Sequence, residues 1–151
     1  MDTSEFRAFV DRSAVEYAEA KVQSGNWTAS GAEERARQEQ ARLLPQGQAT
    51  PAHHFFAIEH EGQPAGGIWL CTDPKVAGGA GYIFDLFVNE DARRKGVGRQ
   101  AMLLLETEAA RLGLKSLALH VFGHNLPARA LYEKLGYSVT NINMSKPIGG
   151  E

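Results

Sequence analysis

The chain places three consecutive cations, Arg93, Arg94 and Lys95, directly before a pair of glycines, Gly96 and Gly98. Two glycines spaced by one residue let the backbone approach a ligand closely. A helix that begins there leaves unpaired N–H groups pointing outward, with a partial positive charge behind them. This combination is typical of an anion site, and the three cations indicate an anion with more than one phosphate. A solvated basic loop is the plain alternative.

A strand and a helix must flank this turn if it is to bind an anion in that way. The apolar run over residues 81–88 predicts a buried strand, and the pattern from Val97 to about Arg111 predicts a helix that stops at Gly113. The apolar face of that helix is expected to hold Ala101, Leu104, Leu105, Ala109 and Leu112.

The rest of the chain supplies alternating helical and strand patterns around this centre. Ser4 is expected to cap a helix over residues 4–24, and Ser30 with Glu33 forms a capping box for a second helix that ends near Pro45. Further segments are strands at 53–58 and 65–71 joined by a hairpin turn, a strand at 117–122, a helix from Pro127 to Gly136 and a last strand at 137–144. We therefore expect an α/β layer with a mixed sheet, in the order α-α-β-β-β-α-β-α-β.

Composition restricts the class of protein. A chain of 151 residues has the size of one domain, so we expect a single domain over residues 1–151. No apolar run approaches the roughly 18 residues needed to cross a membrane, and the acidic start with Asp2 is not a secretory signal. The single cysteine, Cys71, cannot form an internal disulfide, so we expect a cytoplasmic protein. A net charge of -2 predicts no nucleic-acid or membrane partner and makes the cations at 93–95 a local feature.

The glycine turn also fits a second phosphate-binding pattern. Residues 96–101 match G-x-G-x-x-A, the fingerprint of NAD(P)-binding Rossmann enzymes. That fingerprint usually follows its strand through a tight turn, whereas here four residues and three cations intervene. A P-loop does not fit either, because no Lys-Ser or Lys-Thr follows the glycines. A dinucleotide enzyme is therefore kept only as a remote alternative.

The pattern Arg93-x-x-Gly96-x-Gly98 resembles the (Gln/Arg)-x-x-Gly-x-(Gly/Ala) signature of the GCN5-related N-acetyltransferase (GNAT) superfamily. Asn125 and the segment from Pro127 through Tyr132 to Tyr137 follow in that family's order and spacing. The resemblance covers residues 82–137 closely and the preceding fifty residues loosely. It implies the GNAT fold, a mixed central sheet flanked by helices in which the parallel strands 82–88 and 117–122 splay apart.

The resemblance also implies acetyl-CoA as the co-substrate. The main chain of residues 86–88 would pair with the pantetheine arm like an added strand, and the amides of residues 94–99 would hold the pyrophosphate. Asn125 would bind the pantetheine, although an Asn in a loop is often only a turn residue. The expected coenzyme-binding residues are Leu86, Phe87, Val88, Arg93, Arg94, Lys95, Gly96, Val97, Gly98, Arg99, Asn125, Ala128 and Tyr132.

Three residues are candidates for proton transfer. By family position Tyr132 would act as general acid toward the leaving thiolate, although its place on an apolar helix face also fits a core tyrosine. His120 is the first candidate base because its ordinary pKa lies near 6.5, and a histidine packed between strand and helix is the alternative. Asp85 is the second candidate, because a carboxylate in an apolar strand is costly to bury unpaired. Related enzymes sometimes carry a glutamate where this chain has Phe84, so the base, or a water chain in its place, stays open.

The acceptor side carries the weakest signal. Trp27, Trp69 and Phe84 are expected to line the acceptor pocket, and the two tryptophans filling the core is the alternative. His53, His54 and Cys71 are not assigned to a metal, because adjacent histidines on a strand point to opposite faces.

We therefore expect an acetyl-CoA-dependent N-acetyltransferase that moves the acetyl group to a primary amine by direct attack in a ternary complex. Direct attack is favoured because Cys71 lies outside the recognised site. A sensor that binds acyl-CoA without turnover is the alternative from a different class. The acceptor, a small molecule or a peptide or protein amine, stays open, as do a preference for longer acyl groups and a homodimer.

Overall fold

The structure, a computed structural model, describes residues 1–149. Its elements are α1 (Thr3–Gln23), α2 (Ala32–Leu43), the 3-10 turn η1 (Gly47–Ala49), β1 (His53–His60), β2 (Gln63–Cys71), α3 (Pro74–Ala77), β3 (Ala80–Val88), the 3-10 turn η2 (Glu90–Ala92), α4 (Val97–Arg111), β4 (Ser116–Leu119) and α5 (Leu126–Lys134). The expected α/β class is confirmed. Within the described residues, no helix is long and apolar enough to span a membrane.

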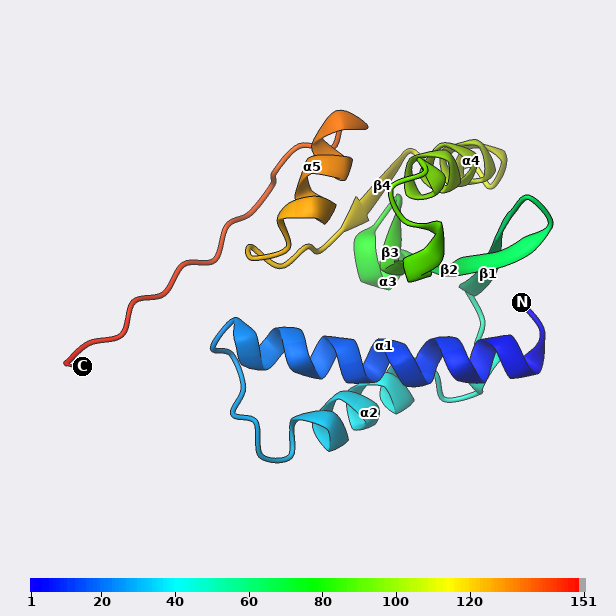
Figure 1. The fold of residues 1–151 in the computed structure, drawn as a ribbon. Helices are drawn as coiled ribbons and strands as arrows, with labels where there is room; N and C mark the ends of the chain where they lie inside the picture. The colour runs from blue at the N-terminus through cyan, green and yellow to red at the C-terminus, as the bar shows by residue number, and fades with distance from the viewer. Residues whose placement is uncertain (150–151) are drawn as a thin grey trace.

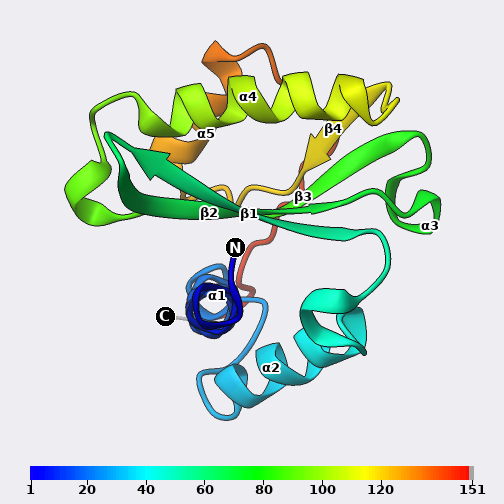
Figure 2. The ribbon, with the colours of Figure 1, turned by 90° about the vertical axis from the view of Figure 1, so that its right-hand side faces the viewer.

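The four strands form one mixed sheet in the order β1-β2-β3-β4 (Figure 1). β1, β2 and β3 run antiparallel to one another in turn, and β3 and β4 are parallel. Figure 2 shows α4 and α5 over one face of the sheet and α1 and α2 over the other. Because only one pair of the described strands is parallel, this is not the doubly wound parallel sheet of a dinucleotide-binding domain. The NAD(P) alternative is therefore wrong.

Each face of the sheet has its own core. Between the sheet and α4, Leu70 and Met102 are fully buried. Between the sheet and α1 lies an aromatic cluster of Phe6, Phe9, Phe55 and Trp69 with Leu44. Leu104, which the sequence placed on the buried face of α4, is 72% exposed. That prediction is wrong because α4 is rotated so that Met102, and not Leu104, lies beside the buried residues Ala101, Leu105 and Ala109.

A β-bulge interrupts the pairing of β2 with β3. Trp69 pairs with Asp85 and Leu70 with Ile83, so Phe84 is an extra residue on β3. Such a bulge changes which face the following side chains point to. Phe84 and Phe87 consequently both pack into the aromatic cluster beside α1. In a regular strand, two residues three positions apart would point to opposite faces.

The parallel strands separate directly after the bulge. β4 pairs with β3 only between Ser116–Leu119 and Ala80–Ile83, whereas β3 stays paired with β2 as far as Val88. The splay that the family resemblance implied is therefore confirmed. It leaves the β4 side of β3 open beyond Ile83 within the described part of the chain.

Several boundaries differ from the sequence prediction. α1 is capped by Asp2, whose side chain and Glu5 form a reciprocal capping box, so Ser4 is not the cap. α2 is preceded by Gly31 in a left-handed conformation, and Ser30 does not cap it. β4 ends at Leu119, short of the expected residue 122. No strand forms over residues 137–144 in the described chain, and this segment leaves the body of the molecule as an extended tail (Figure 1).

Candidate functional site

The glycine turn ends in a helix start that has unbonded amides. Gly96 precedes α4 with a left-handed backbone (φ 74°) and no side chain caps this helix. The first amide to bond back to the turn is that of Gln100, which donates to the carbonyl of Gly96 over 3.1 Å. Within residues 1–149, no backbone carbonyl accepts from the amides of residues 94–99. This helix start therefore has the geometry and the partial positive charge of an anion site.

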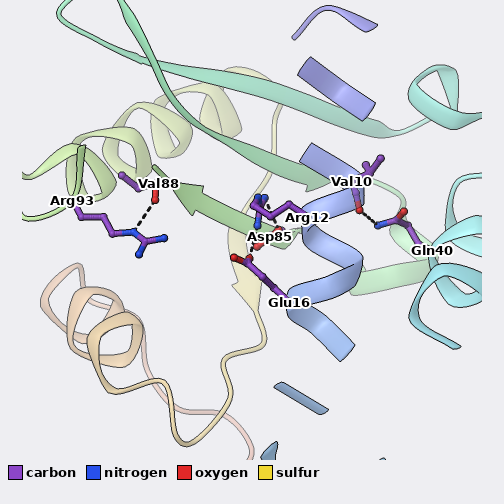
Figure 3. Close-up of polar contacts among 7 residues, drawn as sticks. All are labelled: Val10, Arg12, Glu16, Gln40, Asp85, Val88 and Arg93. Atoms are coloured by element: carbon purple, nitrogen blue, oxygen red, sulfur yellow. Dashed lines mark hydrogen bonds and ion pairs between the residues drawn. The ribbon is translucent and has the colours of Figure 1, made fainter. Parts of the chain in front are cut away.

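The cations of the turn are arranged in two ways. Arg93 donates from Nε to the carbonyl oxygen of Val88 over 2.8 Å (Figure 3). Its guanidinium lies 5.6 Å from the ring centre of Phe87. Arg94, Lys95 and Arg99 are exposed, and no carboxylate of the described residues lies within 4.0 Å of their side-chain nitrogens. Three cations are thus free to meet an anion, while a fourth ties the turn to the end of β3.

The open side of β3 offers backbone groups to a ligand. The amide of Asn89 donates to Ala65 in β2 over 2.7 Å, so the carbonyl of Val88, on the far side of the same peptide, points away from β2. In a strand, the N–H and C=O of one residue point to the same side. The N–H of Val88 and the N–H and C=O of Leu86 therefore face the gap. The Val88 carbonyl also faces it, but it already accepts a hydrogen bond from Arg93.

Tyr132 lies on α5 beside this gap. Burial, with a smaller contribution from the charge of Asp85, raises the pKa of Tyr132 to about 12. Its ring meets that of Tyr137 edge-on, with ring centres 5.8 Å apart. The Tyr137 hydroxyl is buried without a hydrogen-bond partner in the described residues, and burial, followed by the charges of Glu106 and Tyr132, raises its pKa to about 12 as well. Tyr132 is thus a protonated phenol at neutral pH, as a general acid has to be.

Asp85 is held by a residue that the sequence analysis missed. Arg12 of α1 donates from Nη2 to Oδ2 of Asp85 over 3.3 Å and also pairs with Glu16 (Figure 3). Its guanidinium lies 3.7 Å from the ring centre of Phe87. The available signal was the position of Arg12 one turn after the buried Phe9, at the border of the buried face of α1. Asp85 is therefore an ion-paired carboxylate.

His120 stands just beyond the end of β4, on the side of the splay. The residue is exposed to solvent. Neighbouring groups still remove part of the water around the imidazole, and this, followed by the charge of Lys21, lowers the pKa of His120 below 6.5. The ring meets Phe122 edge-on at 4.8 Å. His120 is thus neutral at pH 7 and reachable from solvent, which are the two properties a general base requires.

Asn125 serves as the N-cap of α5. Its Oδ1 accepts from the amide of Ala128 over 3.3 Å. The sequence left a simple turn residue as the alternative for Asn125 and did not predict this cap. The cap uses the side-chain oxygen and leaves the Nδ2 donor for a ligand.

The three aromatic residues expected to line the acceptor pocket fall into two clusters. Trp69 is buried, stacks on Phe84 at 4.7 Å and donates from Nε1 to His53 over 2.9 Å. Trp27 packs against Tyr17 at 5.6 Å near the link between α1 and α2. Trp69 thus fills the core, which is the alternative that the sequence allowed. Of the other two residues expected in the pocket, Phe84 packs against Trp69 and Trp27 does not.

The adjacent histidines of β1 point to opposite faces, as expected. His53 stacks on Phe84 at 5.9 Å, while His54 stacks on Phe56 at 6.3 Å. Cys71, 3.7 Å from His53, is almost fully buried, and burial raises the pKa of its thiol.

Comparisons with known proteins agree with this geometry. Residues 16–137 match the model of the acetyltransferase (GNAT) family. The chain is 36% identical to the uncharacterized N-acetyltransferase YycN of Bacillus subtilis over 98% of this chain and 96% of that one, and 36% identical to YdgE of the same organism over 98% and 95%. The crystal structure of YycN superposes with a TM-score of 0.92 over 98% of this chain and 95% of that one. A GCN5-related N-acetyltransferase from Ralstonia eutropha, 26% identical, superposes with a TM-score of 0.68 over 99% and 96% of the two chains.

Proposed function

The chain belongs to the GNAT acetyltransferase family, and on that premise we propose that it transfers the acetyl group of acetyl-CoA to a primary amine by direct attack in a ternary complex. One observation carries the proposal. β3 separates from β4 beyond Ile83, and the gap lies beside a helix start at which the amides of residues 94–99 are unbonded within the described chain. A site for an extended chain therefore adjoins a site for an anion.

The residues present fit coenzyme A. Leu86 directs its N–H and C=O into the gap and Val88 directs its N–H there, where these groups can pair with the amides of a pantetheine arm as an edge strand does. The free amides of the turn, with Arg94, Lys95 and Arg99, match the charge of a pyrophosphate. Asn125 keeps its Nδ2 as a donor to the pantetheine. When bound, acetyl-CoA supplies the activated acetyl group.

Two side chains would move the protons. His120, held neutral by its lowered pKa, accepts a proton from the attacking amine, directly or through water. Tyr132, protonated because its pKa lies near 12, donates a proton to the departing thiolate. Asp85, paired with Arg12, is assigned to positioning Arg12. The amide of Val88 would stabilise the oxyanion on the acetyl carbonyl.

Direct attack is favoured over a covalent acyl-enzyme. Cys71 is the only cysteine in the chain, and it is 1% exposed in the sheet. Its thiol has a raised pKa, which lowers the fraction of reactive thiolate. Neither property suits a residue that carries an acyl group.

Release of free thiol from acetyl-CoA, measured with a panel of small amines, amino acids, peptides with free N-termini and lysine peptides, tests the proposal. We expect amine-dependent release together with an acetylated product of the matching mass. Tight binding of coenzyme A without release for any class of amine would contradict acetyl transfer and would favour an acyl-CoA sensor. Release that is independent of the amine would indicate hydrolysis.

A further inference from the structure

The C-terminal end of α1 lies against the segment that follows β4 (Figure 1). Tyr17 packs on Phe122 with ring centres 6.1 Å apart, and Oγ of Ser24 lies 3.3 Å from Nδ1 of His124. Helix positions that are four and three residues apart share one face, so Lys21 lies between Tyr17 and Ser24 on the same face. Lys21 therefore faces the segment that follows β4.

The ammonium group of Lys21 is held in place without a carboxylate partner. Its Nζ lies 5.4 Å from the ring centre of Tyr17 and 5.7 Å from that of Trp27, within the range of cation–π contacts. In residues 1–149, no carboxylate oxygen lies within 4.0 Å of this nitrogen. Arg35, which also lies over Trp27, is by contrast 4.0 Å from Glu39. Lys21 is thus a half-buried cation that is available to an anion.

This cation borders the place where the acceptor amine would react. β4 ends at Leu119, and the segment beyond it begins with His120, the proposed base. Burial lowers the pKa of His120, and the charge of Lys21 lowers it further, so the ammonium acts on the imidazole. An amine that reaches His120 from the side of α1 meets Lys21 on its way.

α1 carries a group of the opposite charge earlier in its sequence. Arg12 pairs with both Glu16 and Asp85, and one guanidinium against two carboxylates leaves this group negative. Glu16 and Lys21 are five residues apart, which is about 8 Å along a helix axis. The helix therefore presents negative charge toward β3 and positive charge toward the end of β4. This polarity matches a molecule that has both an ammonium and a carboxylate.

We infer that Lys21 is a specificity residue that binds a carboxylate of the acceptor, so that the acceptors are amines carrying a carboxylate, as amino acids and peptides with a free C-terminus do. The inference rests on the proposed acetyl transfer. An acceptor with positive charge alone, such as a polyamine, would be repelled by the ammonium of Lys21. A neutral acceptor that covered Lys21 would leave the cation without a partner, which costs free energy.

Pairs of acceptors that differ only in the carboxylate test this inference. L-leucine, γ-aminobutyrate and the dipeptide alanyl-leucine are each compared with the corresponding carboxamide by thiol release from acetyl-CoA. We expect at least one acid to have a kcat/KM about 10-fold or more above that of its amide, the scale of one charge-assisted hydrogen bond. The three pairs place the carboxylate at different distances from the amine, so they also separate amino acids from peptides.

Substitutions of Lys21 assign the preference to this side chain. Lys21→Met should abolish the preference for the acid, Lys21→Glu should reverse it, and Lys21→Arg should retain it. The acidity of each amine cancels, because wild type and variant are compared on the same pair. Lys115→Met removes an exposed lysine directly before β4 and is the matched control, which should keep the preference of the wild type.

Calorimetric titration of the same acids and amides into protein saturated with coenzyme A repeats the comparison without turnover. Thiol release without a preference for any acid, or a preference that Lys21→Met retains, would overturn the inference and leave acetyl transfer standing. A preference that Lys115→Met also loses would contradict it as well, because the effect would then come from overall charge. Absence of thiol release with every amine would contradict acetyl transfer itself, and the inference would fall with it.

Discussion

Arg12 in α1 and Asp85 in β3, 73 residues apart in the chain, meet through a 3.3 Å hydrogen-bonded ion pair between the first helix and the sheet. Their side chains are 20% and 23% exposed, and the guanidinium also covers the ring of Phe87. The pair joins the first helix to the strand that diverges from β4. It therefore ties α1 to the part of β3 that borders the gap.

The Arg12–Asp85 pair should stabilise the fold measurably. In a double-mutant cycle with Arg12→Met and Asp85→Asn, we expect a coupling free energy of about 1 kcal/mol, the upper end for partly exposed ion pairs. Urea unfolding of the four proteins gives this value. As a control, Arg37→Met with Glu33→Gln breaks an exposed pair within α2 and should show a smaller coupling. A coupling near zero for Arg12 and Asp85 would mean that each side chain acts independently.

Gly96 should be needed for its backbone conformation. Its φ of 74° lies in the left-handed region, and an added Cβ would meet no atom within 4 Å, so Gly96→Ala introduces strain without a clash. We expect a loss of about 1 kcal/mol, which lowers Tm by roughly 2–4 °C in a chain of this size. Gly123→Ala is the control, because Gly123 has neither a left-handed φ nor a close neighbour. Equal melting temperatures for the two variants would contradict the assigned strain.

Local patterns predicted the elements that surround the turn. The spacing of apolar residues and the glycines located β3, α4 and α5 to within a few residues, because both signals depend on neighbours in the chain. The helix caps were less certain: Asp2 and Ser4 are both good caps, and only the backbone geometry distinguishes them.

Contacts between distant segments were not visible in the sequence. The bulge at Phe84 depends on how β2 and β3 are registered, and Arg12 reaches Asp85 only because α1 crosses β3. The exposed flank of α4 at Leu104 depends on how the helix is rotated over the sheet. The last strand expected over residues 137–144 does not form in the described chain, because a residue pattern does not show whether a partner strand lies beside the segment.

Tyr132→Phe should slow the reaction without weakening coenzyme binding. Loss of a general acid is expected to lower kcat by about 10–100-fold, and the phenyl ring keeps the packing on Tyr137. Because the pKa of Tyr132 is raised to about 12, the phenol stays protonated throughout the assay range and should add no basic limb to the wild-type profile. Kinetics and calorimetry with coenzyme A check both points. An unchanged kcat would return Tyr132 to a purely structural role.

His120 should set the acidic limb of the pH profile. The neutral imidazole is the active form, and its lowered pKa keeps it neutral further into the acid range, so the limb of kcat should have its midpoint below 6.5. His120→Ala is expected to remove this limb and to lower kcat at pH 7 by roughly 100-fold. All variants are measured with the same amine, so that the protonation of the acceptor affects each pH profile equally.

Asp85→Asn and His60→Ala are the matched comparisons for His120. His60 lies at the end of β1 and pairs with Glu61 at the surface, so its loss should leave the profile unchanged. Asp85→Asn should retain the acidic limb, because its carboxylate is engaged by Arg12. If the limb disappears in Asp85→Asn and survives in His120→Ala, the carboxylate is the base and His120 is a surface residue. If it survives in both, proton transfer runs through water or another group.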